Sequence, residues 1–416
     1  MERALLVTIK IRSEREVWHL EEVASELEEL AITCGVEIVD NITSMCDRPT
    51  PNYFIGKGKT EELAVIAQEE NIDVVIFSHD LSGVQQRNLE EVIGKKIIDR
   101  TQLILHIFAK HAHTPEGKLQ VELAQLQYLM PRLIGKGLIL SRTGGGIGTS
   151  GPGETRLETD RRRIREKLDK LRADLKQVTV RRETSRKRRK DNAIPSVALV
   201  GYTNAGKSTL LNALTQSNQV VSNGLFTTLD PVYKSLQLPG GENIIISDTV
   251  GFLHNLPHHL VEAFKATLEG VMEADLLIHV LDVSSPHAYE LHKAVIDVLK
   301  ELKAESKPMI TALNKIDLLE NKELLNRYKK DFINPVAISA KSHENLDILL
   351  KNIQENFADR MVDLKLELPA KRMDLLNLFY REGKVKEVKY IQDKIKIQVS
   401  LPKILYNKLL SNKEIQ

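Results

Sequence analysis

The segment from Ser196 to Thr215 constrains the fold most, because it joins an apolar run, SVALV, to a glycine loop and then to the helical pattern STLLNALT. The loop satisfies G-x-x-x-x-G-K-[ST] and reads Gly201-Tyr202-Thr203-Asn204-Ala205-Gly206-Lys207-Ser208. Its glycines let backbone N–H groups turn around phosphates, and the helix start adds a favourable dipole. Lys207 is expected to reach the β- and γ-phosphates, and the Ser208 hydroxyl to bind Mg²⁺. This order of strand, loop and helix predicts an α/β domain that binds a nucleotide.

Four further apolar runs fit parallel strands buried on both faces, and they read NIIISD, LLIHVLD, PMITALN and PVAIS. Three short motifs lie at strand ends and read Asp248-Thr249-Val250-Gly251, Asn314-Lys315-Ile316-Asp317 and Ser339-Ala340-Lys341. Asp248 is expected to hold the Mg²⁺ shell through water, and the Gly251 N–H to sense the γ-phosphate. Asp317 can accept from guanine N1–H and N2–H₂, Asn314 can contact the other ring edge, and a backbone N–H of the third motif can reach guanine O6. Adenine lacks the donors that Asp317 needs, so we predict GTP as the ligand.

The segment Leu225-Phe226-Thr227-Thr228-Leu229-Asp230-Pro231 follows the glycine loop along the chain. A threonine here can bind Mg²⁺ only while the γ-phosphate is present, and it would then order the segment in the GTP state. We favour Thr228 over Thr227 for this role and expect residues 226–230 to contact the nucleotide. The alternative is a surface loop that carries a threonine pair. Together with Lys207 and Gly251, Thr228 completes the predicted catalytic set.

Two positions beside the phosphates set expectations for hydrolysis. Phe252 follows D-x-x-G, where Ras-like GTPases commonly have a Gln that orients the attacking water. A phenyl ring can neither donate to that water nor accept from it, and no arginine occurs between Gly224 and Leu260, so we expect slow intrinsic hydrolysis. Asn204 either helps to hold a K⁺ ion beside the phosphates or only braces the loop.

Residues 1–112 alternate the apolar runs ALLVTIKI, VEIVDNI and DVVIFS with helical patterns at Trp18–Cys34, Lys59–Glu70 and Val84–Ile93. This alternation predicts an N-terminal α/β subdomain with a largely parallel sheet. The loop PNYFIGKGK, at Pro51–Lys59, either holds an anion at a helix start or forms an ordinary turn. The residues leave open whether this subdomain binds a second nucleotide such as ATP.

Residues 113–192 carry two helical patterns on either side of a glycine-rich loop at 135–153. Apolar residues recur at alternating steps of four and three, at Leu119, Leu123, Leu126, Met130 and Leu133, and at Ile164, Leu168, Leu171, Leu175 and Val178. Such a repeat predicts two helices packed as a hairpin. The loop has eight glycines and few apolar side chains, so we expect it to be mobile and exposed.

The net charge of +2 is unevenly distributed. Residues 155–190 hold 16 Lys or Arg and 6 Asp or Glu, a net of +10, which leaves −8 for the rest of the chain. Phosphate binding responds to local charge density, so this block predicts contact with RNA phosphates; the alternative is a solvated helix face. The pairs His111 with His113 and His258 with His259 lack a Cys or carboxylate at ligand spacing, which favours packing roles over metal binding.

Residues 361–416 read strand, helix, two strands and helix, which predicts a small α+β domain. No apolar run approaches the ~20 residues needed to span a bilayer, and charges come too early for a signal peptide. Cys34 and Cys46 are too few for a disulfide framework or a zinc site. We expect a cytoplasmic monomer, with peripheral membrane association left open.

The nucleotide motifs, together with FIGKGK, LFTTLDP and the glycine loop GGGIGTSGPGETRLETDRRRI, closely resemble the HflX family of ribosome-associated GTPases. The resemblance implies a Ras-like P-loop GTPase domain at 196–360 and binding to the large ribosomal subunit and its RNA. It also implies that the GTP-bound protein dissociates or recycles ribosomes under stress. One alternative is a GTPase of ribosome assembly or RNA modification; another is a nucleotide-regulated ribosome-binding module in which hydrolysis is incidental.

Overall fold

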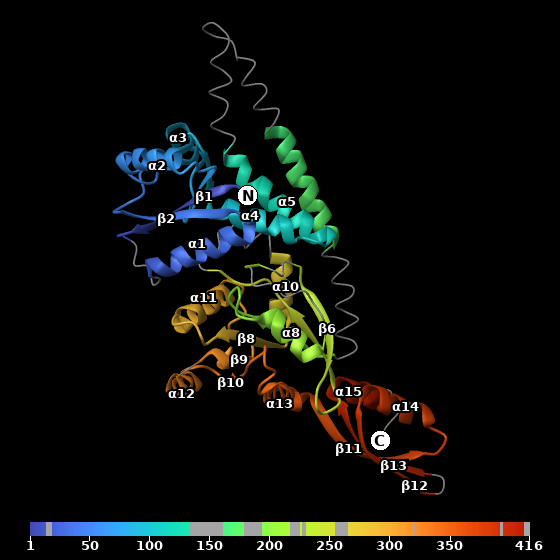
Figure 1. Ribbon diagram of the computed structural model, residues 1–416. Coiled ribbons are helices and arrows are strands. Elements are labelled where there is room, and N and C mark those ends of the chain that lie inside the picture. Colours follow the sequence, from blue (N-terminus) through green and yellow to red (C-terminus); the bar gives the residue numbers. More distant parts are fainter. Residues whose placement is uncertain are drawn as a thin grey trace. The chain divides into compact units, whose positions relative to one another are not determined.

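The computed structural model describes residues 1–13, 19–132, 161–178, 194–216, 225–226, 230–253, 265–319, 321–391 and 394–411 of the 416-residue chain. The chain divides into two compact units. The first unit comprises Met1–Thr179, Ser222–Asp230 and His254–Thr267, and the second comprises Val180–Val221, Pro231–Leu253 and Leu268–Gln416. The described residues form three sheets, one in the first unit and two in the second (Figure 1).

The sheet of the first unit has parallel strands in the order β2-β1-β3-β4. They are β1 (Arg3–Ile11), β2 (Glu37–Cys46), β3 (Val74–Phe77) and β4 (Lys96–Asp99). The helices are α1 (Leu20–Cys34), α2 (Lys57–Glu69), α3 (Gly83–Ile93) and α4 (Arg100–His111). Because α2 and α3 lie on one side of the strands and α1 on the other (Figure 1), β1 and β3 are almost entirely buried. The three strands and three helices predicted here are confirmed, and Trp18 lies outside the described residues.

The sequence pattern does not single out β4 and α4. Strand β4 has four residues and runs directly into α4, so it offers neither a clear period of two nor a turn signal. Asp99 stabilises the junction between β4 and α4, because its carboxylate accepts a hydrogen bond from the Gln102 N–H at 2.8 Å and thereby caps α4. The same carboxylate pairs with Arg132 at 2.9 Å, which fastens the end of the next helix to the sheet.

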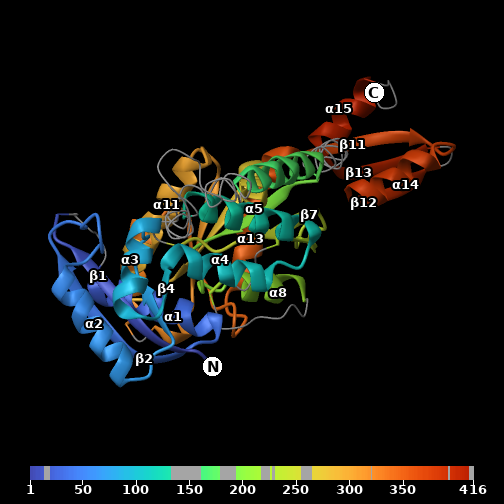
Figure 2. The same cartoon turned by 90° about the horizontal axis from the view of Figure 1, so that it is seen from above.

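The long helix α5 (Pro115–Arg132) and a helix over residues 161–178 also belong to the first unit. Helix α5 lies beside α4 (Figure 2). Leu123 of α5 packs with Leu168 and Leu171, and Lys167 pairs with Glu122 at 2.5 Å. The predicted packing of the two apolar stripes is therefore confirmed. The glycine-rich loop at 135–153 lies outside the described residues.

The larger sheet of the second unit has the order β10-β9-β8-β5-β7-β6, and only β6 runs antiparallel to its neighbour. Its strands are β5 (Ser196–Val200), β6 (Val232–Gln237), β7 (Asn243–Asp248), β8 (Leu276–Asp282), β9 (Met309–Asn314) and β10 (Pro335–Ala337). The associated helices are α8 (Lys207–Thr215), α10 (Lys265–Glu273), α11 (Ala288–Glu301), η2 (Ile316–Leu318), α12 (Lys322–Asp331), α13 (Leu346–Phe357) and η3 (Ala358–Arg360). All five predicted apolar runs are confirmed as strands. The edge strand β6, VYKSLQ, is half exposed and polar, which explains why hydropathy does not reveal it.

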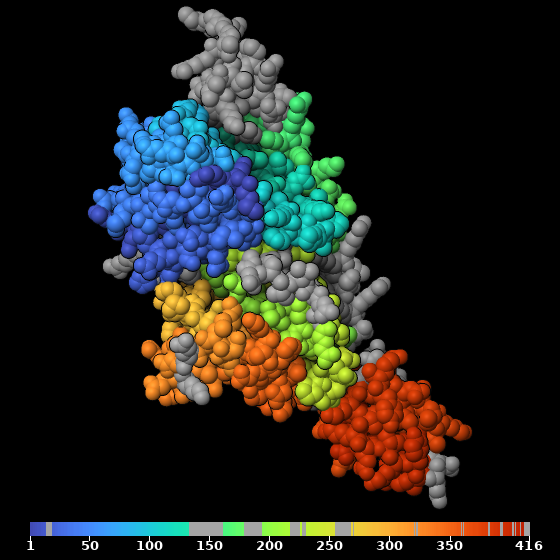
Figure 3. All heavy atoms as spheres, in the orientation of Figure 1, coloured from blue at the N-terminus to red at the C-terminus, as the bar shows by residue number. Residues whose placement is uncertain are grey.

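The remaining sheet is antiparallel, with the order β11-β13-β12. Its elements are β11 (Met361–Pro369), α14 (Met373–Glu382), β12 (Lys384–Ile391), β13 (Lys394–Pro402) and α15 (Lys403–Ser411), as predicted. Alternate residues of β13, from Ile395 to Leu401, are buried together with residues of α14 and α15. The atoms of this segment, red in Figure 3, form a compact lobe. No helix in the described part of the chain is long and apolar enough to cross a membrane.

Candidate nucleotide site

The glycine loop leaves β5 at Gly201 and enters α8 at Lys207. A Cβ on Gly201 would lie 2.4 Å from the carbonyl oxygen of Val280 in β8. A Cβ on Gly206, whose φ is +95°, would lie 2.4 Å from Nδ2 of Asn314. Both glycines are therefore required by close packing against neighbouring strands, and the shape of the loop depends on the whole sheet.

Lys207 lies inside this loop, with a residue exposure of only 6%. Its Nζ donates hydrogen bonds to the carbonyl oxygens of Gly201 at 3.1 Å and Tyr202 at 2.7 Å. Burial lowers the pKa of Lys207 to about 8, while the nearby carboxylate of Asp248 acts in the opposite direction. The loop thus holds a buried amine, and a bound phosphate group would stabilise its protonated form.

Ser208 and Asp248 bring two oxygen groups together beside Lys207. The Ser208 hydroxyl donates to Oδ2 of Asp248 at 2.6 Å, and Asp248 is fully buried at the end of β7. Next to it, the Thr249 hydroxyl donates to the carbonyl oxygen of Leu199 at 2.7 Å, which fastens this motif to β5. Mg²⁺ prefers oxygen ligands and keeps several waters, so this hydroxyl and carboxylate fit the predicted metal site.

The backbone of Phe252 is hydrogen-bonded to the glycine loop. Its N–H donates to the Gly201 carbonyl at 3.1 Å, and its carbonyl accepts from the Thr203 N–H at 2.9 Å. The residue itself is 1% exposed, so its ring belongs to the core and is sequestered from water. A Cβ on Gly251 would lie 2.7 Å from Cγ2 of Thr203 and 3.0 Å from Nζ of Lys207, which explains the glycine before Phe252.

Asn314 connects two of the predicted motifs to each other. Its Nδ2 donates to the Ala205 carbonyl at 2.8 Å, and its Oδ1 accepts from the Ala340 N–H at 3.0 Å. The sequence predicts that Asn314 contacts the base, but it does not predict these two hydrogen bonds, because their partners are 109 and 26 residues away along the chain. Asn314 thereby fixes the spacing between the phosphate loop and the segment expected to reach guanine O6.

The other residues predicted to read the base follow β9 and β10 along the chain. Asp317 is exposed in η2, and Lys341 is exposed after β10. Ser339 is buried, and its hydroxyl accepts from the Ser342 N–H at 3.1 Å. Lys315 pairs with Asp282 at 2.6 Å, a partner that sequence reasoning missed. The sequence feature that could have revealed this pair is the position of Asp282 at the end of β8, where it lies opposite Asn314 of β9.

The segment predicted to bind Mg²⁺ is described only at its ends. Thr227, Thr228 and Leu229 lie outside the described residues, as do the histidines at 254, 258 and 259. Phe226 and Asp230 belong to the first unit and contact residues of that unit. His111 bonds through Nδ1 to the Ile107 carbonyl at 3.0 Å, and the described residues contain no group of three potential metal ligands.

The chain is similar to known proteins along most of its length. Three family models match, described as "GTP-binding GTPase N-terminal" over residues 21–109, "GTP-binding GTPase Middle Region" over 111–189 and "50S ribosome-binding GTPase" over 196–315. The chain is 47% identical over 400 residues to GTPase HflX of Caldanaerobacter subterraneus subsp. tengcongensis, which covers 96% of this chain and 91% of that protein. It is 39% identical over 410 residues to GTPase HflX of Escherichia coli, covering 98% and 95%. The chain belongs to the HflX family of GTPases.

This HflX-family member is therefore a GTP hydrolase, which converts GTP and water to GDP and phosphate. Among solved structures, a complex of SsGBP with GDP is similar, with a TM-score of 0.49 and 26% identity, covering 85% of this chain and 98% of that one. The predicted resemblance and the α/β fold class with a P-loop GTPase domain are both confirmed.

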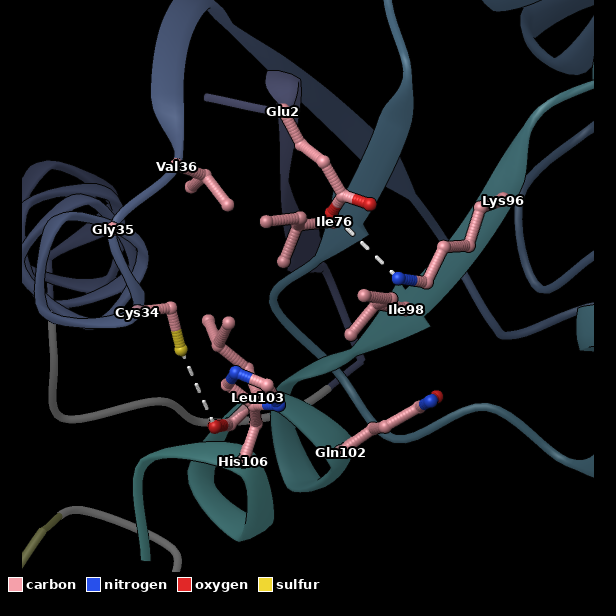
Figure 4. Close-up of a pocket in the computed structure, with 10 residues that line it drawn as sticks. All are labelled: Glu2, Cys34, Gly35, Val36, Ile76, Lys96, Ile98, Gln102, Leu103 and His106. Carbon is pink, nitrogen blue, oxygen red and sulfur yellow. Dashed lines mark hydrogen bonds and ion pairs between the residues drawn. The ribbon is translucent and has the colours of Figure 1, made fainter. Parts of the chain in front are cut away.

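The first unit of this HflX-family chain contains a cavity of about 190 Å³ (Figure 4). Ile76, Ile98 and Leu103 are among its lining residues, and Glu2 pairs there with Lys96 at 3.6 Å. Burial raises the pKa of the Cys34 thiol, which also lines the cavity, to about 12, so it stays protonated and unreactive. Small-molecule sites usually measure about 300–1,000 Å³. This cavity is too small for a second nucleotide.

Proposed function

We propose that the protein binds the large ribosomal subunit through its RNA and couples GTP binding and hydrolysis to dissociation of the ribosome. The observation that carries this proposal is the cationic face of the helix over residues 161–178. Its exposed basic residues are Arg162, Arg163, Arg165, Lys167, Lys170, Arg172 and Lys176. The opposite stripe of this helix is buried against α5, so the charges project to solvent.

A basic helix face of this kind suits RNA, because phosphate contacts supply most of the affinity and do not depend on base sequence. The family model that matches residues 196–315 is described as a ribosome-binding GTPase, which supports the same class of partner. The GTP site would then act as the switch that times binding and release.

The residues of the nucleotide site take the following roles in this proposal. Residues 201–208 hold the phosphates, and Lys207 stabilises the negative charge that develops on them. Ser208 and Thr228 are the direct Mg²⁺ ligands, and Asp248 acts through water. Bound Mg²⁺ would neutralise charge on the β- and γ-phosphate oxygens. Residues 226–230 and 248–251 respond to the γ-phosphate, and residues 314–317 and 339–341 read the base.

Hydrolysis would depend on the ribosome, because the buried ring of Phe252 cannot orient the attacking water. If a partner supplies the missing polar group, stimulation on the order of 10³–10⁵-fold is expected. Single-turnover hydrolysis with and without large subunits measures this effect. Fast hydrolysis by the protein alone, unchanged by subunits, contradicts it. Asn204 is exposed at φ +59°, and we assign it to a K⁺ site; equal rates in potassium and sodium contradict that assignment.

Density-gradient sedimentation of intact ribosomes tests the proposed function. We expect subunit dissociation with GTP and with a non-hydrolysable analogue, and none with GDP. A variant with Arg161, Arg162 and Arg163 changed to Gln should bind ribosomes more weakly and with a flatter salt dependence. A matched variant with Lys329, Lys330 and Lys351 changed to Gln removes the same charge from α12 and α13 and should behave like the natural chain. Intact ribosomes in every nucleotide state would favour a role in assembly.

A further inference from the structure

The glycine loop of the nucleotide site contains a buried hydroxyl group, that of Thr203. This residue is 6% exposed, and its hydroxyl has no hydrogen-bond partner among the residues that the structure describes. Buried hydroxyls of the neighbouring D-x-x-G region are different. Thr249 donates to the Leu199 carbonyl at 2.7 Å, and Ser247 donates to a carbonyl of the same strand at 3.2 Å. Thr203 thus carries a buried polar group that the described protein does not satisfy.

Such a hydroxyl destabilises the folded protein, because its hydrogen bonds to water are lost and are not replaced. Valine has a methyl group in place of the hydroxyl and would avoid this cost. A buried polar group without a partner therefore calls for an explanation, and a bound ligand that completes the hydrogen bond is one. Sequences break these packing rules chiefly at functional sites. The choice of threonine at position 203 points to a ligand.

Thr203 lies beside the groups expected to bind the γ-phosphate. A Cβ built on Gly251 would lie 2.7 Å from Cγ2 of Thr203, 2.9 Å from its Cα and 3.0 Å from Nζ of Lys207. The threonine side chain and the lysine amine therefore flank the same glycine. Because the hydroxyl of Thr203 shares its carbon with Cγ2, this hydroxyl lies next to the Gly251 backbone.

Two backbone hydrogen bonds fix Thr203 relative to Gly251. The Thr203 N–H donates to the Phe252 carbonyl at 2.9 Å, and the Phe252 N–H donates to the Gly201 carbonyl at 3.1 Å. Phe252 directly follows Gly251, so these bonds join the glycine loop to the D-x-x-G motif at this point. A donor that is held in place in this way can stabilise charge without a cost of reorganisation.

We propose that Thr203 is a catalytic residue, whose hydroxyl donates a hydrogen bond to the γ-phosphate of GTP during hydrolysis. The inference rests on the proposed placement of this phosphate beside Gly251 and Lys207. The transferring group carries its charge on three equatorial oxygens, and catalysis consists mostly of positioning and electrostatic stabilisation. The attacking water bonds to the γ-phosphorus, the bond to the bridging oxygen of GDP breaks, and Thr203 keeps its proton. Thr203 thus contributes to the hydrolysis that the protein performs alone.

The test measures single-turnover GTP hydrolysis and GDP affinity of the full-length protein, with Mg²⁺ and without ribosomes. Thr203→Val should lower the hydrolysis rate by about 10- to 150-fold, the range for a hydrogen bond to a charged group. Its GDP affinity should be unchanged, because GDP lacks the γ-phosphate. Thr203→Ser keeps the hydroxyl and should retain most of the rate.

Thr311 in β9 provides the matched control. It is fully buried, and its hydroxyl also has no partner within the described part of the chain. Thr311→Val makes the same chemical change outside the nucleotide motifs and should alter neither hydrolysis nor GDP affinity. In urea denaturation both valine variants should be at least as stable as the natural chain, since each loses an unpaired buried hydroxyl. Slower hydrolysis at undiminished stability is a result that a merely structural role of Thr203 does not give.

Natural hydrolysis by Thr203→Val would overturn the proposal. Equal slowing in Thr203→Ser would also overturn it, because the methyl packing and not the hydroxyl would then matter, as would equal slowing in Thr311→Val. Lower stability or lower GDP affinity of Thr203→Val would contradict a specific role at the γ-phosphate. Lys207→Ala separates this inference from the proposed function. If it slows hydrolysis and Thr203→Val does not, only the role of Thr203 fails; if it has no effect, the placement of the γ-phosphate fails.

Discussion

Two loops in this protein place glycine and lysine at the start of a helix, and they differ in how tightly they are packed. In the first unit, Gly56 and Gly58 flank Lys57 at the start of α2; in the second, Gly206 precedes Lys207 at the start of α8. A Cβ on Gly56 or Gly58 would meet nothing within 4 Å, whereas a Cβ on Gly206 would collide with Asn314.

The lysines differ in the same way. Lys57 and Lys59 form ion pairs with Glu61 at 3.6 Å and Glu62 at 2.6 Å on their own helix. Lys207 is buried on backbone carbonyls of its loop, and no acidic residue of the described chain is within ion-pair distance of it. A phosphate site therefore needs a loop packed so tightly that only glycine fits, and a lysine whose charge is not already neutralised on its own helix. On these grounds we expect the FIGKGK loop to be an ordinary turn and not an anion site.

The largest expected effect separates the two lysines directly. Lys207→Ala should lower the rate of GTP hydrolysis by ~10²–10³-fold, because one preorganised group that stabilises transition-state charge is removed. Lys57→Ala should leave the rate unchanged, because its charge is already paired at the surface. Single-turnover hydrolysis of both variants measures the contrast. A comparable loss in Lys57→Ala would mean that the first loop also contacts a nucleotide.

Base specificity should depend on neither loop. Asp317→Asn replaces an acceptor with a group that also donates, so affinity for GTP should fall by about 10- to 150-fold, the usual cost of a hydrogen bond to a charged group. Affinity for xanthosine triphosphate should rise. Competition binding with both nucleotides provides the measurement, and full retention of GTP preference would refute the guanine-reading role.

Alanine at the two glycine positions should change stability in opposite directions. Gly206→Ala forces a left-handed residue against Asn314 and should lower the free energy of unfolding by about 1–3 kcal/mol. Gly58→Ala should raise it by up to about 1 kcal/mol, because alanine is favoured in a helix. Urea denaturation of both variants tests the contrast. Equal destabilisation would show that the first loop is packed more tightly than its open surroundings indicate.

The smallest effect concerns pH. The pKa of Lys207 is lowered to about 8 by burial, so the nucleotide-free protein loses this charge as the pH rises above 8. Phosphates favour the charged amine, so GTP affinity should be constant below pH 8 and should fall above it by at most tenfold per pH unit. Isothermal titration from pH 7 to 9.5 gives this profile. The same profile in Lys207→Met would assign the titration to another group.

Local sequence patterns were sufficient to predict the strongly periodic strands and helices. Runs such as SVALV and LLIHVLD are buried on both faces, so their composition alone predicts strands, and the leucine stripes of the hairpin predict its packing. The strands β4 and β6 escaped prediction for two different reasons. Strand β4 is too short to show a period, and β6 lies at a half-exposed edge, where polar residues are tolerated.

The sequence by itself determined which residues can perform the chemistry. The order of the glycine loop, the D-x-x-G motif and the base-reading motifs at strand ends predicts a GTP site, because parallel strands bring their carboxyl ends to one edge. Only the tertiary structure decided how these residues are held. The hydrogen bonds of Asn314 to Ala205 and Ala340 join residues that are far apart along the chain. The contacts of Phe226 with Phe108 and of Asp230 with Thr114 also join residues more than a hundred positions apart. Such contacts leave no periodicity in the sequence, because each depends on one pair of atoms that meets only after the chain has folded.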